Sequence, residues 1–352
     1  MTALLSIEHL TVRFGASAVV DDVSLTIDPG EKFALVGESG SGKSITALSV
    51  LGLVDGASTS GRIVFDGNDL RGFSEPQMRA IRGGEIAMIF QEPMTALNPL
   101  HTIGAQIVEV LRLHEKLGRG EARERAIALL DRTGIPEPAR RVDAWPHQLS
   151  GGQRQRAMIA MALACRPRLL IADEPTTALD VTIQAQILDL MRNLRDETGT
   201  AIVLITHDLG VVAEMCDRVA VMYAGEIVEH TDVESLFATP LHPYTRGLIG
   251  SIPVVGDVRE ELAVIPGNVP NLIDLPKGCR FAPRCLTRVE EDLAISLEVH
   301  PSLLPAAPDH DVRCWVYHDA RGEPIPRHEP DASAAAPSGV PEPLTGGPAA
   351  RA

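Results

Sequence analysis

GESGSGKS, residues 37–44, is the stretch that decides the fold, and a short apolar run, FALVG (33–37), leads into it. It matches G-x-x-x-x-G-K-[S/T], a glycine-rich turn between a buried strand and a helix. In such a loop, backbone N–H groups and the helix N-terminus bind phosphate oxygens. Lys43 is expected on the β- and γ-phosphates, and the Ser44 hydroxyl on Mg²⁺. The expected nucleotide contacts are Gly37, Glu38, Ser39, Gly40, Ser41, Gly42, Lys43 and Ser44.

A second apolar run, LLIADE (169–174), ends in two acidic residues. Asp173 lies at the end of the predicted strand and is placed to hold Mg²⁺ through water. Glu174 is placed to polarise an attacking water as general base. A strand that ends in Asp-Glu is weak evidence alone, but a phosphate-binding loop earlier in the chain makes it a strong sign of nucleotide hydrolysis.

LSGGQ (149–153) opens a predicted helix just before that run. Ser150, Gly151, Gly152 and Gln153 combine glycine-exposed N–H groups with a serine hydroxyl at a helix N-terminus, which predicts a second anion site. One nucleotide does not need two phosphate cradles in one chain, so we expect this one to serve a nucleotide bound to another subunit. The alternative is a serine N-cap with glycines that serve packing.

Outside these motifs, short apolar runs alternate with helical patterns, which predicts an α/β fold with a largely parallel sheet covered by helices. The expected strands are 4–14, 18–27, 33–37, 62–67, 85–90, 169–173, 201–206 and 218–223. The expected helices are 43–53, 103–133 with a break near Gly118 and Gly120, 150–165, 181–197 and 209–216. After about residue 240 the sequence is Pro-rich and loop-like.

The composition is that of a soluble globular protein: 352 residues, 45% of them hydrophobic and 22% charged. The net charge of −15 argues against a nucleic-acid partner, because such binding needs basic patches. The first residues, MTALLSIEHL, lack the basic segment of a secretory signal. No apolar run approaches the ~18 residues that span a bilayer. We therefore expect a cytosolic location.

The P-loop, LSGGQ and LLIADEP together resemble the nucleotide-binding subunits of ABC transporters over about residues 4–240. The resemblance implies a P-loop NTPase of the ABC ATPase type, with a mixed sheet core, an antiparallel β subdomain and an α-helical subdomain at about 92–165. Gln91 looks like the Q-loop glutamine, which contacts Mg²⁺ and senses the membrane subunit. His207 looks like the switch histidine on the γ-phosphate.

Two more positions follow from the same resemblance. Ala178-Leu179-Asp180 looks like the D-loop, which crosses the dimer interface, and Phe14 lies where the family stacks an aromatic ring on adenine. The resemblance implies that two ATP molecules are sandwiched head-to-tail between two such subunits, with Mg²⁺. Each ATP would contact one chain's P-loop and the Ser150/Gly152 region of the other, and the second subunit is expected to be a related ATPase.

Two further stretches, QEPMTALNP (91–99) and TPLHPYTRGL (239–248), resemble the dipeptide- and oligopeptide-import ATP-binding subunits. This implies ATP hydrolysis that energises peptide import, at the cytoplasmic face of the membrane. The implied partners are two membrane permease subunits and an extracytoplasmic solute-binding protein. The alternatives are import of nickel or another small solute, and a soluble ABC ATPase outside transport. The implied domains are the ATPase at 1–240 and an extension at 241–320. The segment 321–352 is Pro/Ala/Gly-rich without periodicity, which predicts a disordered tail.

GCRFAPRC (278–285) brings two of the five cysteines close together. Clustered cysteines in a cytosolic protein more often bind metal than form a structural disulfide. In some peptide-import relatives a similar extension with four cysteines holds an iron–sulfur cluster, and Cys279, Cys285 and Cys314 match three of them. The segment 286–300 lacks the fourth, for which Asp292, His300 or a ligand from solution are the options. The alternatives are therefore a [4Fe-4S] cluster or a structural remnant, with Cys165 and Cys216 as buried thiols.

Overall fold

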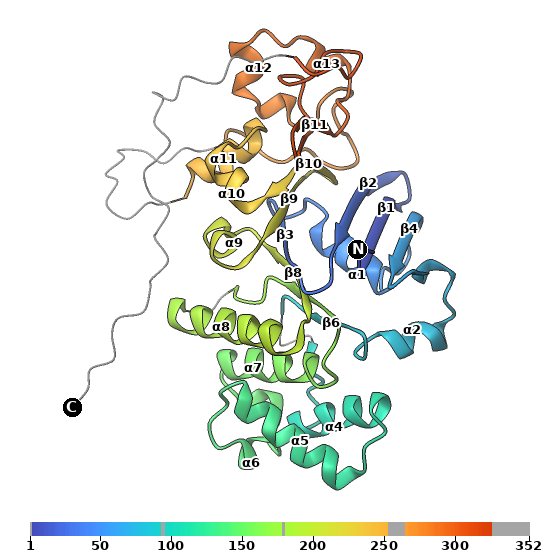
Figure 1. Cartoon of the computed structure of the whole chain (residues 1–352), viewed down its shortest axis with the longest axis vertical. Helices are drawn as coiled ribbons and strands as arrows, with labels where there is room; N and C mark the ends of the chain where they lie inside the picture. The colour runs from blue at the N-terminus through green and yellow to red at the C-terminus, as the bar shows by residue number, and fades with distance from the viewer. Residues whose placement is uncertain (1, 93–95, 178–179, 253–264, 326–352) are drawn as a thin grey trace, which may run out of the picture.

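The computed structural model describes residues 2–92, 96–177, 180–252 and 265–325. Residues 178–179 of the predicted D-loop, 93–95 of the stretch 91–99, and the predicted tail from 326 onward lie outside these residues. The described chain forms two sheets with helices around them (Figure 1). Within the described residues, the structure contains no helix with the length and apolar character that membrane crossing requires.

The smaller sheet is antiparallel and has four strands in the order β2-β1-β4-β5. Its strands alternate buried and exposed residues, because one face packs on the core and the other faces water. Both long strands were predicted within one residue of their bounds. The strands are β1 (Leu5–Phe14), β2 (Ser17–Ile27), β4 (Ser58–Phe65) and β5 (Asn68–Asp69).

The larger sheet has eight strands in the order β11-β12-β10-β9-β3-β8-β7-β6. The run from β6 to β9 is parallel, and the remaining pairs are antiparallel, so the sheet is mixed. β7 and β8 are buried along their whole length, as strands covered on both faces are. The strands are β3 (Lys32–Val36), β6 (Ile86–Ile89), β7 (Leu169–Asp173), β8 (Ala201–Thr206), β9 (Arg218–Tyr223), β10 (Glu226–Asp232), β11 (Leu304–Ala307) and β12 (His310–Val312).

Helices cover both faces of the larger sheet and form a separate group beyond it (Figure 1). α1 and the smaller sheet pack on one face, and α7, α8 and α9 on the other. α4, α5 and α7 share a core of their own, which is the predicted helical subdomain. The helices are α1 (Lys43–Val50), α2 (Glu75–Ile81), α4 (Ile103–His114), α5 (Arg119–Arg132), α6 (Pro138–Arg141), α7 (Gly151–Ala162), α8 (Val181–Thr198), α9 (Leu209–Met215), α10 (Val233–Ala238), α11 (Pro243–Gly250), α12 (Leu286–Glu290) and α13 (Ile295–Glu298).

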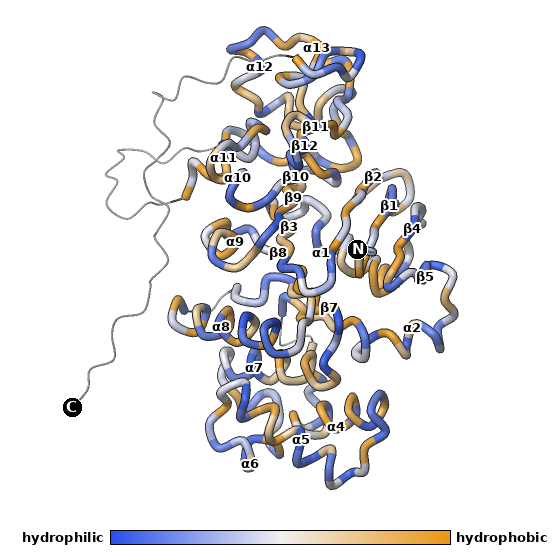
Figure 2. Tube along the Cα trace, in the orientation of Figure 1, coloured by the Kyte–Doolittle hydropathy of each residue, from blue (hydrophilic) through white to orange (hydrophobic). Residues whose placement is uncertain are grey.

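The hydropathy of the chain follows this layering. In Figure 2 hydrophilic parts interrupt the hydrophobic ones along the strands of the smaller sheet, and hydrophilic residues are frequent in α5. α5 nevertheless buries Ala122, Ala126 and Leu130 on one face, at the helical spacing of four residues. The apolar pattern of the sequence therefore encodes which face of each element meets a core.

The segment after residue 240 differs from its prediction as loop-like sequence. It contains α11, α12 and α13, and the strands β11 and β12 extend the larger sheet by pairing β12 with β10. Glu229 and Val312 are register partners across that pair. These strands have only four and three residues, which is too short for an alternating apolar and polar pattern to be recognised in the sequence.

Candidate active site

The P-loop runs from the end of β3 to the start of α1 and lies tightly against its neighbours. Gly37 has a φ of +154°, and a Cβ there would lie 2.1 Å from the carbonyl oxygen of Met222. Gly42 has a φ of +104°, and a Cβ there would lie 2.8 Å from the carbonyl oxygen of Val19. Neither position can hold a side chain, because the obstructing atoms are backbone. The two motif glycines thus let the loop fold over β9 and β2.

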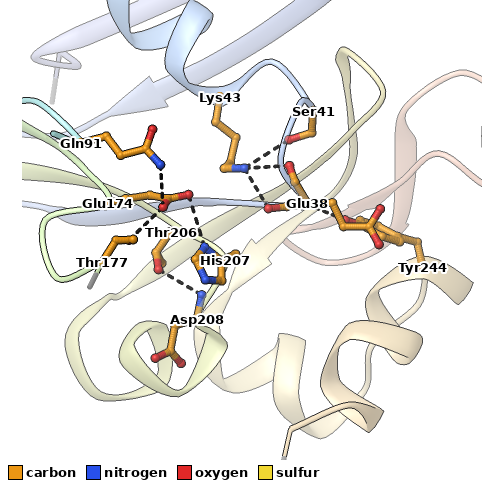
Figure 3. A network of polar contacts seen from close by, with 11 residues as sticks. Glu38, Ser41, Lys43, Gln91, Glu174, Thr177, Thr206, His207, Asp208 and Tyr244 are labelled. Atoms are coloured by element: carbon orange, nitrogen blue, oxygen red, sulfur yellow. Dashed lines mark hydrogen bonds and ion pairs between the residues drawn. The ribbon is translucent and has the colours of Figure 1, made fainter. Parts of the chain in front are cut away.

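Lys43 is buried inside this loop. Its Nζ donates hydrogen bonds to the carbonyl oxygens of Gly37 at 2.8 Å and Glu38 at 2.9 Å (Figure 3). A longer contact of 3.4 Å reaches the Ser41 hydroxyl. Burial lowers the pKa of Lys43, while the nearby carboxylates, with Glu174 foremost, oppose that shift. An ammonium ion held in this way is placed to meet an anion that enters the loop.

Asp173 is the last residue of β7 and is 4% exposed. Burial raises the pKa of its carboxyl group, and a hydrogen bond with Ser44 works against this. Among the described residues, no hydrogen-bond donor meets its Oδ1. A buried carboxylate with one unsatisfied oxygen beside a hydroxyl is a donor set that suits a hard divalent cation. Two of the three residues predicted to contact Mg²⁺, Ser44 and Asp173, therefore lie together.

Glu174 directly follows β7 in a left-handed backbone conformation, with a φ of +46°. Its Oε2 accepts hydrogen bonds from Gln91 Nε2 at 3.0 Å and Thr177 Oγ1 at 2.8 Å, and its Oε1 lies 3.3 Å from His207 Nδ1 (Figure 3). Burial raises the pKa of Glu174, but the hydrogen bonds from Thr177 and His207 and nearby positive charge outweigh burial. The pKa therefore lies below its ordinary value.

The structure thus brings Gln91, Glu174 and His207 together, although they come from three separate segments of the sequence. Gln91 follows β6, and His207 follows β8, so all three lie where neighbouring parallel strands end. This edge is where open α/β sheets place their ligands. The His207 side chain is largely exposed, so it can contact a group outside the chain.

The LSGGQ segment forms the start of α7 as predicted. Ser150 is the N-cap: its Oγ accepts a hydrogen bond from the backbone N–H of Gln153 at 3.3 Å. The Gln153 side chain accepts one from the Ser150 N–H at 3.2 Å, which completes a capping box. A Cβ at Gly151 would meet no atom, so this helix end is open toward solvent. The N-cap alternative is therefore realised, and anion binding by this segment stays a prediction.

Two other residues predicted to contact the nucleotide, Asp180 and Phe14, lie at the ends of regular elements. Asp180 is the exposed N-cap of α8, and its carboxylate accepts a hydrogen bond from the Ile183 N–H at 3.0 Å. Phe14 ends β1 with 38% of its surface exposed, which leaves ring surface available for stacking. The exposed P-loop residues Ser39 and Gly40 complete the outer side of the loop.

Several residues of the site were missed by sequence reasoning. The Thr177 hydroxyl donates a hydrogen bond to Glu174. It lies only three residues after Glu174, so the sequence alone could have indicated this contact. Tyr244 and Arg284, by contrast, contact Glu38 of the P-loop from the C-terminal extension. No local pattern predicts contacts between residues more than two hundred positions apart.

The three cysteines of the extension are largely buried. Burial raises the pKa of both Cys279 and Cys314 to about 12, and the other thiols of the extension add to the rise. A proposed fourth ligand, His300, instead contacts Glu226 at 2.8 Å. No group of three or more metal-binding side chains with suitable geometry occurs in the parts of the chain that the structure describes. A cluster on these three thiols therefore stays a prediction.

Comparisons with known proteins agree with this architecture. A family model described as ABC transporter matches residues 20–177, and one described as the oligopeptide/dipeptide transporter C-terminal region matches residues 228–291. Among solved structures, cbiO1 from Clostridium perfringens, part of the ABC transporter complex cbiONQ, has a TM-score of 0.59 at 30% identity, covering 68% of this chain and 92% of that one. The fold expected from the resemblance is confirmed.

A dimeric structure of the ATP-binding cassette MJ0796, in a post-hydrolysis state bound to ADP and Pi, also has a TM-score of 0.59, at 31% identity over 65% of this chain and 98% of that one. The oligopeptide transport ATP-binding protein AppD of Bacillus subtilis (strain 168) is 50% identical over 330 residues, covering 92% of this chain and 99% of that protein. A putative peptide import ATP-binding protein of Brucella abortus (strain 2308) is 52% identical, covering 88% of this chain and 96% of that protein. The chain therefore belongs to the ABC transporter ATP-binding family, in the branch that carries the oligopeptide/dipeptide transporter C-terminal region.

Proposed function

We propose that this chain hydrolyses ATP at the site around Lys43 and Glu174, and that hydrolysis energises the import of di- or oligopeptides. The observation that carries the catalytic part is the position of Glu174, which three side chains hold beside the P-loop. The peptide substrate is supported by the names of its relatives and by the family of its C-terminal region. Nickel or another small solute is the alternative within this family.

The P-loop binds the phosphates of ATP in this proposal. Residues 39–44 supply backbone N–H groups, and the Lys43 ammonium, oriented by the Gly37 carbonyl oxygen, contacts phosphate oxygens. Ser44 and Asp173 would hold Mg²⁺, which supplies charge neutralisation of the triphosphate when bound. Phe14 supplies an aromatic surface for adenine.

Glu174 acts as the general base. Because its pKa lies below the ordinary value, its carboxylate is ionised at neutral pH and can take a proton from the attacking water. Gln91 and Thr177 hold one carboxylate oxygen, which leaves the orientation of the group fixed. His207, on the other oxygen, is exposed and is placed to contact the γ-phosphate.

The proposed assembly has a second, related ATPase subunit. The open N-terminus of α7 at Ser150–Gln153 would contact the nucleotide of that partner, and Asp180 would lie at the shared interface. The dimeric state of MJ0796 supports an assembly of two ATP-binding subunits. Two membrane permease subunits would bind the ATPase dimer at the cytoplasmic face of the membrane and change conformation when the dimer closes. An extracytoplasmic solute-binding protein would deliver the peptide.

Glu174→Gln tests the catalytic part in the complex formed with the subunits encoded by neighbouring genes. The variant is expected to bind ATP with unchanged affinity and to hydrolyse it about 10²–10⁴ times more slowly, because it lacks a general base. Phosphate release and binding of a fluorescent ATP analogue measure the two effects. Asp189→Asn on the exposed face of α8 is the matched control. Turnover at the wild-type rate in Glu174→Gln would contradict the assignment.

The substrate class needs a separate measurement. In proteoliposomes, the solute-binding protein loaded with a peptide mixture is expected to stimulate phosphate release, whereas Ni²⁺ alone is not. The reverse result would favour the alternative. A cluster on Cys279, Cys285 and Cys314 stays a prediction, tested by iron and acid-labile sulfide in a complex purified without oxygen.

A further inference from the structure

The C-terminal extension touches the P-loop directly at Glu38. The hydroxyl of Tyr244, in α11, accepts a hydrogen bond from the Glu38 backbone N–H at 2.9 Å (Figure 3). The guanidinium of Arg284 donates two hydrogen bonds to the Glu38 carboxylate, at 2.7 and 3.0 Å. Such a two-pronged pair fixes direction as well as distance. One P-loop residue is thus held at its backbone and at its side chain by the extension.

The peptide group between Gly37 and Glu38 is bound at both ends. Its N–H donates to Tyr244, and its carbonyl oxygen accepts from Lys43 Nζ at 2.8 Å. Because a peptide group is planar and rigid, whatever orients its N–H also orients its carbonyl. Tyr244 therefore sets the direction of a carbonyl that holds the phosphate-binding lysine.

The two side chains that hold Glu38 cannot easily turn away. Tyr244 is fully buried, with its ring centroid 4.7 Å from that of Tyr223. Arg284 is 7% exposed, lies over the rings of Tyr223 and Phe281, and donates to the Pro266 carbonyl oxygen at 2.8 Å. Packing therefore fixes both groups before any nucleotide binds.

The other arginine of the GCRFAPRC stretch supports a neighbouring part of the loop. Arg280 donates to the carbonyl oxygen of Ala224 at 2.6 Å and pairs with Asp21. The next residue, Gly225, donates its N–H to the Ser41 carbonyl oxygen at 2.9 Å. Both arginines between the paired cysteines thus bear on the P-loop, one directly and one through the turn between β9 and β10.

We propose that Arg284 and Tyr244 are positioning residues of the nucleotide site: they fix the Glu38 end of the P-loop in the conformation that binds ATP. The proposal rests on the proposed binding of ATP at this loop. Arg284 has a second role, because it neutralises a carboxylate that would otherwise repel the triphosphate from within the loop. Tyr244 acts only through the backbone.

The variant Arg284→Gln tests whether Arg284 affects ATP binding rather than only the stability of the fold. The KM for ATP of the assembled transporter is expected to rise roughly tenfold, the scale of one charge-assisted hydrogen bond, with kcat changed less than about twofold. Arg284→Lys should recover part of the loss because it keeps the charge. Adding Glu38→Gln to Arg284→Gln should lower KM again, because it removes the unneutralised carboxylate. Because an unpaired carboxylate also weakens the fold, the melting temperature is measured in parallel: recovery of KM beyond the recovery of melting temperature identifies the electrostatic role.

Arg313→Gln is the matched control. Arg313 is also a buried arginine of the extension, but it donates to the carbonyl oxygens of Ile227 and Pro301, away from the P-loop. Its loss is expected to lower the melting temperature and to leave the KM for ATP unchanged. Tyr244→Phe removes one oxygen and keeps the ring, so it folds even where an arginine variant does not. It should raise KM without the recovery by Glu38→Gln.

The outcomes are distinguishable from failure of the proposed function. Wild-type complex that does not hydrolyse ATP would contradict the proposed function itself. Wild-type complex that hydrolyses ATP, with unchanged KM in both Arg284→Gln and Tyr244→Phe, would overturn the positioning role alone. An equal rise of KM in Arg313→Gln would also overturn it, since the effect would then follow from weakening the extension in general.

Discussion

Asp173 is a residue whose own environment opposes its charge. Burial at the end of β7 raises the pKa of its carboxyl group, and one of its oxygens has no donor among the described residues. A buried charge without full pairing lowers the stability of a fold. Such an arrangement is typical of a functional site, where a ligand supplies the missing interaction.

Asp173→Asn should therefore separate stability from binding. The melting temperature of the nucleotide-free chain is expected to stay equal or rise, because the amide carries no charge to bury. The Mg²⁺-dependent affinity for ATP is expected to fall about tenfold or more, which corresponds to ~1.4 kcal/mol of binding free energy. Thermal shift assays with and without Mg²⁺ and ATP measure both quantities. A clear loss of nucleotide-free stability, with ATP affinity intact, would contradict this account.

At the residue scale, the sequence predicts the residues whose roles depend on local spacing. Lys43 and Ser44 begin α1, and Asp173 and Glu174 stand at the end of β7, so motif and position coincide. Glu38 was predicted only as a phosphate contact. Arg284, which binds the Glu38 carboxylate, lies 246 positions away in the sequence, and only the folded chain brings the two residues together.

At the level of elements, α11 begins with a titratable cap. Nδ1 of His242 accepts a hydrogen bond from the Tyr244 N–H at 3.0 Å, and the ring is 1% exposed. Burial, with help from nearby arginines, lowers the pKa of His242 to about 4 even though two glutamates oppose the shift. These charged neighbours are Glu229, Glu226, Arg246 and Arg313. The histidine is therefore neutral at physiological pH.

This cap makes the attachment of the extension sensitive to acid. Between pH 6.5 and about 4 the unfolded chain binds a proton at His242 that the folded chain does not, so stability falls as the pH falls through that window. The loss amounts to roughly 3 kcal/mol across the window. His242→Asn keeps a cap acceptor without this titration. Its melting temperature should decline less than that of the wild type from pH 6.5 to 4; identical slopes would contradict the prediction.

The bounds of a helix or strand were predictable where the sequence contained a continuous run of apolar residues. β7 and β8 match their predicted bounds, because an uninterrupted apolar run is bounded by polar residues on both sides. The helix predicted to reach residue 53 ends at Val50, since Gly52 takes a φ of +60° that the helix cannot continue through. β11 and β12 exist because of the partner strand β10, which no local signal reveals.

For the whole molecule, the extension continues the core. β12 pairs with β10, and buried Glu229 accepts hydrogen bonds from the N–H groups of Leu241 and His242 and contacts His310 Nε2 at 2.8 Å. Phe281 packs against the rings of Tyr223 and Tyr244. The apolar cluster behind the P-loop therefore needs residues from both sides of position 240.

A chain that ends after Thr239 should consequently fail to remain soluble. Its loss of Tyr244 and Phe281 alone removes two buried aromatic side chains, worth ~1.5–3 kcal/mol each, from a total stability of ~5–15 kcal/mol. It also makes β10 an edge strand, paired with β9 on one side only, which promotes aggregation. A chain that ends after Ile325 keeps every helix and strand of the described residues and is the control, expected to melt within about 2 °C of the full chain. Soluble, cooperatively melting protein from the shorter chain would contradict this view.

The hold of Arg284 on Glu38 has a consequence for biosynthesis. The ribosome makes Glu38 early but adds its partner 246 residues later, which at ~5–20 residues per second takes roughly 12–50 s. During that interval the nascent chain carries the nucleotide motif without the groups that orient it. Until Arg284 has been added and has folded into place, the nascent chain is expected to bind ATP about tenfold more weakly, so the full affinity for ATP is reached only late in synthesis.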